Sequence, residues 1–187
     1  GVRSGEKGVL GKGGQGEADV PGKVRMVAPD GRVKSSVVTP SKREYNIQRR
    51  DGRKSTMVTP PATVLARIKS DGDAVSTARQ REAPLGDFWR GFDWPALGRI
   101  SGIYGSQRIL NGQPRQPHYG IDIAAPTGTP VYAPASGLVT LVKDLYFSGW
   151  TVVIAHGLGV NSSFLHFDRV DVETGMIVER GGLIGKI

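Results

Sequence analysis

The stretch His118-Tyr119-Gly120-Ile121-Asp122 places a histidine and an aspartate four residues apart, where a β-like run ending at Ala125 begins. Imidazole nitrogen and carboxylate oxygen are both good zinc ligands, and a catalytic zinc typically takes three protein ligands and a water. In a fully extended strand, residues four apart lie about 13 Å from each other. Because the neighbouring prolines and Gly120 disfavour a helix, we expect a bend near Gly120, with His118 on a loop and Asp122 on a strand.

Beyond this stretch, the sequence from residue 97 onward is typical of β structure. Short apolar runs alternate with turns rich in Gly, Pro, Ser and Asp. We expect strands at 131–133, 137–143, 150–155 and 162–167, and two more in 170–177 and 183–187. Short strands without intervening helices predict a mainly β domain, built as a small antiparallel sheet or sandwich, over residues 95–187.

Residues 1–94 divide into three segments of different composition. Residues 1–22 hold seven glycines in the first sixteen positions, which predicts a flexible glycine-rich arm. Residues 23–58 surround the turn sequence Pro29-Asp30-Gly31, which predicts a hairpin within a partial β segment. Residues 59–94 form a linker with one helix, expected over 61–82. Gly72 weakens that helix by about 1 kcal/mol relative to alanine, so two shorter helices are the alternative.

The net charge of +8 is concentrated in the first half of the chain. Residues 1–95 contain 18 Lys/Arg and 11 Asp/Glu, whereas residues 96–187 contain 7 and 6. A basic half suggests attraction to an anionic polymer such as a bacterial envelope, and the alternative is a solvated linker with no specific partner. Because no aromatic residues are interleaved as base-stacking platforms, nucleic acid is not an expected partner.

The composition excludes several classes of site. There is no cysteine, so disulfides and thiolate zinc sites are excluded. No run approaches the roughly 20 apolar residues that cross a bilayer, and we expect no transmembrane segment. The first residues lack the charged-then-apolar pattern of a signal peptide, which an exported protein would therefore carry outside this sequence.

Six short motifs succeed one another in the second half of the chain. They are GRISGIYG at 98–105, HYGIDIAAP at 118–126, GTPVYAPASGLV at 128–139, IAHG at 154–157, FLH at 164–166 and GLIG at 182–185. In this order and with these gaps, they resemble the catalytic domain of lysostaphin-type (LytM-type) zinc metalloendopeptidases. These enzymes cut peptidoglycan cross-bridges. An upstream segment at 43–49 also resembles some Gram-negative members of the family.

The resemblance implies roles for individual residues. His118 and Asp122 match zinc ligands, which makes Zn²⁺ the expected cofactor. His166 matches a family histidine that lies beside the metal without binding it, so it is the candidate catalytic residue that moves protons or steadies the developing oxyanion. His156 matches a position that is usually structural. The third ligand of the family belongs to a His-x-His pair, and no such pair occurs before Ile187.

Two interpretations of the missing pair remain open. As a fragment truncated before the pair, the chain would come from a metalloendopeptidase that hydrolyses peptide cross-links of peptidoglycan, and residues 1–187 alone would be inactive. With a natural end at Ile187, it would be a non-catalytic LytM-type protein that binds peptidoglycan or regulates an amidase. Both interpretations imply peptidoglycan peptides as the partner and a periplasmic or extracellular, envelope-associated location.

Other residues near the motifs have competing interpretations. Arg108 and Arg115 lie in a polar loop before His118, where they either meet substrate carboxylates or are solvated. Asp168 and Asp171 are expected to be loop carboxylates rather than ligands. Trp150 stands where close relatives are expected to carry glycine. The aromatic residues of the linker are expected to dock it onto the β domain. They are Phe88, Trp89, Phe92 and Trp94.

Overall fold

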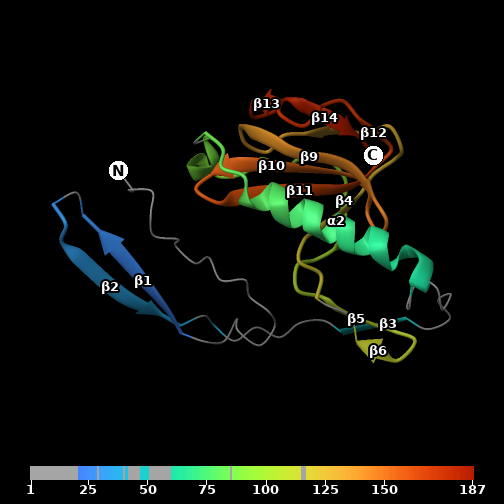
Figure 1. The fold of residues 1–187 in the computed structure, drawn as a ribbon, viewed down its shortest axis with the longest axis horizontal. Helices are drawn as coiled ribbons and strands as arrows, with labels where there is room; N and C mark the ends of the chain where they lie inside the picture. The colour runs from blue at the N-terminus through green and yellow to red at the C-terminus, as the bar shows by residue number, and fades with distance from the viewer. Residues whose placement is uncertain are drawn as a thin grey trace.

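The computed structural model describes residues 21–28, 30–39, 41, 47–50, 60–84, 86–114 and 117–187. These residues are mainly β, with mostly antiparallel sheets, and they include one α-helix that crosses the face of the largest sheet (Figure 1). The predicted fold class is therefore confirmed. The glycine-rich arm up to residue 20 and the segment 42–46 lie outside the described residues.

The largest sheet has four antiparallel strands in the order β11-β10-β9-β13. Their bounds are Val160–Phe167 for β11, Gly149–Gly157 for β10, Gly137–Leu145 for β9 and Ile177–Val178 for β13. Strand β10 is buried on both faces, because Val152 and Ile154 on one side and Val153 and Ala155 on the other are all buried. A strand buried on both faces explains the nearly continuous apolar run in its sequence.

A second, three-stranded sheet in the order β12-β14-β8 packs against the first. It consists of β12 (Arg169–Val170), β14 (Leu183–Lys186) and β8 (Pro130–Tyr132). Val131 and Ile184 of this sheet share one apolar cluster with Val139, Val152 and Ile154 of the first sheet. Burial of these side chains between the sheets supplies the main hydrophobic stabilisation of the domain.

The single strand expected over 170–177 is wrong. The structure has β12 and β13 instead, and each pairs in a different sheet. The chain turns between them at Gly175, whose φ of 99° is readily adopted only by glycine. The turn allows the chain to pass from one sheet to the other, which a continuous strand would prevent.

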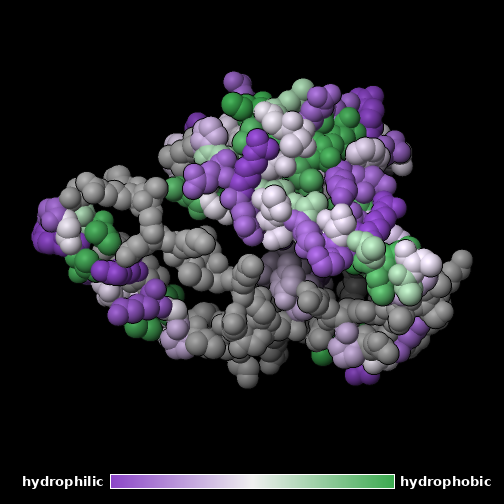
Figure 2. Space-filling model, in the orientation of Figure 1, coloured by the Kyte–Doolittle hydropathy of each residue, from purple (hydrophilic) through white to green (hydrophobic). Residues whose placement is uncertain are grey.

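Helix α2 (Ala62–Gln80) confirms the expected helix and runs unbroken through Gly72, so the alternative of two short helices is wrong. Its contact with the sheet is more polar than its sequence suggests. Leu65 is exposed, whereas Asp71 is buried. The Asp71 carboxylate accepts a hydrogen bond of 2.8 Å from the Tyr146 amide and lies 3.0 Å from Lys143 Nζ. Figure 2 shows hydrophilic and hydrophobic residues interspersed on the face that carries this helix.

The remaining strands form small sheets. The expected hairpin around residues 29–31 is present as β1 (Gly22–Val27) and β2 (Val33–Val38). Strand β4 (Arg99–Gly102) pairs with β7 (Asp122–Ala124). Strand β3 (Ile47–Arg50) pairs with β5 (Gln107–Leu110), which also pairs with β6 (Gln113–Pro114). The β3–β5 pair is parallel and joins a strand from the first 94 residues to the β domain.

Candidate functional site

The structure brings His118 and Asp122 together. His118 lies in the loop before β7, and Asp122 is the first residue of that strand. The expected bend is present at Gly120. As a result, His118 Nε2 lies 3.0 Å from Asp122 Oδ1, although the two residues are four positions apart.

The orientation of the His118 ring is set by the loop after β4. His118 Nδ1 lies 3.3 Å from the carbonyl oxygen of Ile103. Because a carbonyl oxygen can only accept, Nδ1 is the protonated nitrogen of this contact. With Nδ1 engaged in this way, Nε2, which faces Asp122, is the ring nitrogen that can bind a metal ion. The main chain is also fixed, because the His118 amide donates to Ser106 O at 2.9 Å and its carbonyl accepts from Gly105 N at 2.7 Å.

Room for the Asp122 carboxylate comes from Gly102, its partner in the β4–β7 pair. A Cβ atom on Gly102 would lie 2.8 Å from Asp122 Cγ, closer than side-chain carbons approach in real structures. Glycine at position 102 therefore leaves the space in which the carboxylate turns towards His118. Ser101 Oγ, next to this glycine, donates to the Asp122 carbonyl oxygen at 3.3 Å.

The His118–Asp122 pair meets part of the requirements of a zinc site. An imidazole nitrogen and a carboxylate oxygen are the donors that zinc accepts, and the two side chains are 23% and 42% exposed, so an ion can reach them. Two donors are fewer than the usual three. Within the described part of the chain, no group of three or more His, Asp or Glu residues could hold a metal ion. The structure thus joins two of the predicted site residues without a complete ligand set.

In the described part of the chain, His166 does not form a metal-binding group with His118 and Asp122. It lies near the end of β11, is exposed, and has a φ of 64°. This left-handed conformation is uncommon for residues other than glycine. Its amide donates to the carbonyl oxygen of Ser148 at 2.9 Å. Its assignment as the catalytic histidine stays a prediction.

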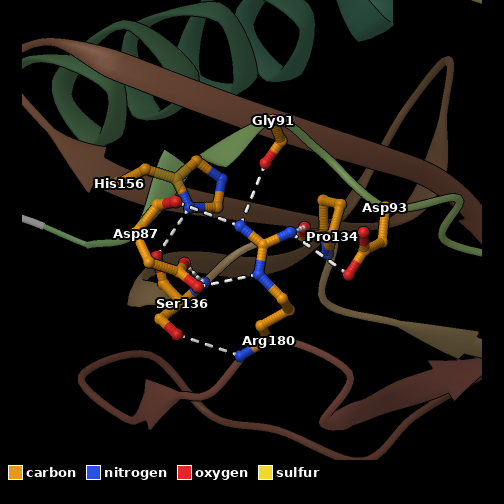
Figure 3. Close-up of polar contacts among 7 residues, drawn as sticks. All are labelled: Asp87, Gly91, Asp93, Pro134, Ser136, His156 and Arg180. Carbon is orange, nitrogen blue, oxygen red and sulfur yellow. Dashed lines mark hydrogen bonds and ion pairs between the residues drawn. The ribbon is translucent and has the colours of Figure 1, made fainter. Parts of the chain in front are cut away.

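His156 is fully buried and both ring nitrogens contact protein atoms, of which Figure 3 shows the contact with Ser136. Nδ1 lies 2.9 Å from the Ser136 carbonyl oxygen, and Nε2 lies 2.7 Å from Ser162 Oγ. The ring of Phe92 meets it edge to face at 5.3 Å. Burial lowers the pKa of His156, which favours the neutral ring. Nδ1 is then the donor to the Ser136 carbonyl oxygen. This arrangement agrees with the structural role expected for the residue.

Arg180 has a structural role that sequence reasoning missed. Its guanidinium spans Asp87 and Asp93, with Nε 2.7 Å from Asp87 Oδ2 and Nη1 3.1 Å from Asp93 Oδ2 (Figure 3). Nη2 donates to the carbonyl oxygens of Asp87 and Gly91 at 3.0 Å each. The hydrogen bond from Arg180 and one from the Ser136 amide lower the pKa of Asp87 to about 2. These contacts join the linker to the segment between β13 and β14.

The expected aromatic docking of the linker is only partly correct. Phe92 contacts His156, but Trp89 and Trp94 are each 64% exposed. The ionic contacts of Arg180 hold this part of the linker in their place.

The remaining candidates contribute less. Asp171 pairs with Arg169, with 2.8 Å between Oδ1 and Nε, which fits a loop carboxylate. Arg108 lies on β5, and Arg115 lies outside the described residues.

Comparison with known proteins points to the same part of the chain. The sequence model of peptidase family M23 matches residues 116–187. The peptidoglycan DD-endopeptidase ShyA of Vibrio cholerae is 34% identical over 116 residues, which are 62% of this chain and 25% of that protein. The lipoprotein YgeR of Escherichia coli, described as uncharacterized, is 30% identical over 133 residues, or 70% of this chain and 49% of that protein.

The fold has a counterpart among solved structures. A crystal structure from Pseudomonas aeruginosa, assigned to peptidase M23, superposes with a TM-score of 0.66 at 30% identity. The superposition covers 89% of this chain and 61% of that one. The chain spans only a quarter of the length of ShyA and about half that of YgeR.

The antiparallel β fold, its counterpart among solved structures and the sequence match therefore agree on an M23 type of domain. Residues 116–187, which hold both of these side chains, belong to peptidase family M23. Among the residues described, no helix has the length and apolar character to cross a membrane.

Proposed function

We propose that this chain is part of a zinc metalloendopeptidase that hydrolyses peptide cross-links of bacterial peptidoglycan, with His118 and Asp122 as two of the zinc ligands. The observation that carries the proposal is the 3.0 Å approach of His118 Nε2 to Asp122 Oδ1, with the His118 ring oriented by Ile103 O. It is supported by ShyA and ShyB, which are 34% and 38% identical over their matched parts and are named peptidoglycan DD-endopeptidases.

Each proposed site residue has a separate task. Zinc, when bound, supplies a Lewis acid for amide hydrolysis. His118 offers Nε2 as a ligand because its other nitrogen is occupied by a main-chain carbonyl. Asp122 offers a carboxylate oxygen in the space left by Gly102. His166 moves a proton from the attacking water to the leaving amine of the cleaved amide.

This activity implies a location in the bacterial envelope, periplasmic or extracellular, because peptidoglycan lies there. The description of YgeR as a lipoprotein fits an envelope relative. Attraction of the basic N-terminal half to an anionic envelope polymer remains a separate prediction, which rests on the charge of residues 1–95 alone.

A non-catalytic LytM-type protein that binds peptidoglycan or regulates an amidase is the second candidate. The observation in its favour is that the described residues supply two metal donors rather than three. The two candidates differ in their need for metal. An enzyme requires a third zinc ligand, whereas a protein that only binds peptidoglycan requires no zinc site.

The test is a peptidoglycan release assay on the full-length natural protein, with zinc content measured for each variant. We expect release of soluble muropeptides by the wild type, and loss of both zinc and activity in His118→Ala and Asp122→Ala. His166→Ala should keep its zinc and lose about 10²- to 10⁴-fold in turnover. If the wild type is folded and retains zinc but releases no muropeptides, the proposal of an enzyme is wrong and the non-catalytic candidate takes its place.

A further inference from the structure

A β-bulge places His166 in its unusual conformation. Trp150 of β10 pairs with Phe167 of β11, and Val152 pairs with Phe164. Between these two pairs, β10 has the single residue Thr151, whereas β11 has two residues, at 165 and 166. The extra residue breaks the alternation of the strand, since both Leu165 and His166 are exposed. Bulges of this kind re-aim a side chain and are common beside active sites.

The conformation of His166 has an energetic cost, because a left-handed φ brings the Cβ atom of an L-residue close to its own main chain. The φ of 64° persists only if the surroundings hold it. The contact that holds it is the hydrogen bond of 2.9 Å from the His166 amide to the carbonyl oxygen of Ser148, in the turn between β9 and β10.

Ser148 is itself fixed by the residue that faces the bulge. Thr151 Oγ1 donates to the Gly149 carbonyl oxygen at 3.0 Å, which uses the only proton of this hydroxyl. The contact of 2.9 Å between Ser148 Oγ and Thr151 Oγ1 therefore has Ser148 as the donor. Thr151 is 3% exposed, so water does not compete for its hydroxyl. A chain of two hydroxyl groups thus links the residue that faces the bulge to the residue whose carbonyl receives the His166 amide.

We propose that Thr151, acting through Ser148, is the positioning residue of His166. The inference rests on the proposed function, in which His166 moves the proton. Removing the Thr151 hydroxyl frees the Ser148 side chain, loosens the acceptor of the His166 amide, and lets the bulge relax. The imidazole then samples orientations in which it no longer reaches the substrate.

The experiment compares Thr151→Val, which keeps the shape and removes the hydroxyl, with Thr151→Ser, which restores a hydroxyl. Thr140→Val is the matched control, because Thr140 is also buried and its hydroxyl donates to Val153 O at 3.3 Å in the same sheet. Amide hydrogen exchange at residue 166 and steady-state kinetics are measured on the full-length protein with its zinc content.

In Thr151→Val, exchange at the His166 amide should rise about three- to tenfold, as expected for one lost hydrogen bond. The kcat should fall about 10- to 100-fold, with KM and zinc content unchanged. Thr151→Ser and Thr140→Val should resemble the wild type.

Equal kinetics and exchange in Thr151→Val and wild type would overturn the proposal, and so would an equal effect of Thr140→Val. If the wild type has no hydrolytic activity, the proposed function fails, and exchange alone decides: a rise confined to residues 165 and 166 supports the positioning role, whereas a uniform rise overturns it.

Discussion

Arg180 Nε lies 2.7 Å from Asp87 Oδ2, and the two residues are 93 positions apart in the sequence. The ion pair is reinforced by hydrogen bonds from the same guanidinium to the carbonyl oxygens of Asp87, Gly91 and Pro134. Asp87 in turn accepts the Ser136 amide at 2.8 Å through its second carboxylate oxygen. One arginine thus connects the linker, the segment before β9 and the segment before β14.

Substitution of Arg180 by lysine tests this connection while it keeps the positive charge. Lysine has no planar fork of donors, so it cannot serve two carboxylates and three carbonyl oxygens together. We expect Arg180→Lys to lower Tm by several degrees. Arg169→Lys, at an exposed pair with Asp171, is the control and should leave Tm nearly unchanged. Equal Tm values for Arg180→Lys and wild type would show that the connection does not stabilise the fold.

Acid should weaken the same region in two steps. The pKa of Asp87 is lowered in the folded state to about 2, so the stability it contributes is complete above its ordinary pKa of about 3.9 and is lost as the pH falls towards 2. The pKa of His156 is also lowered, by burial. Because the unfolded chain takes up this proton first, stability begins to fall below the ordinary histidine pKa of about 6.5.

The measurement is the midpoint of thermal unfolding between pH 8 and pH 2. Asp87→Asn should start less stable and show a flatter dependence between pH 4 and pH 2, because the titrating carboxylate is gone. Asp73→Asn, at an exposed helical pair with Lys69, should follow the wild-type curve. A wild-type slope in Asp87→Asn would assign the acid sensitivity to other groups.

Gly102→Ala should disturb the His118–Asp122 pair while both proposed ligands keep their identity. The new Cβ would lie 2.8 Å from Asp122 Cγ, so the carboxylate must move away from His118. We expect weaker zinc binding and lower stability, measured by zinc titration and thermal unfolding. Gly72→Ala is the matched control: nothing lies within 4 Å of its added Cβ. Alanine should stabilise α2 there by up to about 1 kcal/mol. Unchanged zinc affinity in Gly102→Ala would exclude Asp122 as a ligand in this geometry.

The local features of the fold could be predicted from the sequence. A helix of nineteen residues and the buried strand β10 can be recognised from composition and apolar pattern over a short window. The approach of His118 to Asp122 could also be anticipated, because both residues belong to one motif and Gly120 permits the bend between them.

Features that join distant segments could not be predicted. The parallel pairing of β3 with β5 and the ion pair of Arg180 with Asp87 link residues about 60 and 93 positions apart. No local pattern marks either partner. The bulge at His166 was missed for another reason: its register shift depends on the turn at Ser148, and the histidine lies in an otherwise ordinary strand sequence.

Limited proteolysis should distinguish the linker from the arm. We expect cleavage within the glycine-rich segment 1–22, because exposed glycine-rich backbone is a preferred protease target. The resistant fragment should begin near residue 60 rather than near Trp94. The reason is that α2 is anchored through Asp71 to Tyr146 and Lys143 of the β domain. Mass spectrometry of the fragments gives the boundary. Rapid cleavage inside α2 would mean that these contacts do not hold the helix, and uniform protection from residue 1 would remove the predicted arm.

Residues 1–187 alone should bind zinc weakly. His118 and Asp122 supply two donors, and the described residues complete no set of three, so a chelator should strip the ion readily. Metal analysis after dialysis against a chelator should therefore find well under one zinc per chain. Stoichiometric, chelator-resistant zinc would contradict this expectation and would require a further ligand. His156 is unsuited to that task, because it is fully buried and both of its nitrogens are engaged. The additional ligand would then be sought in His166, and loss of the zinc from His166→Ala but not from His156→Gln would identify it.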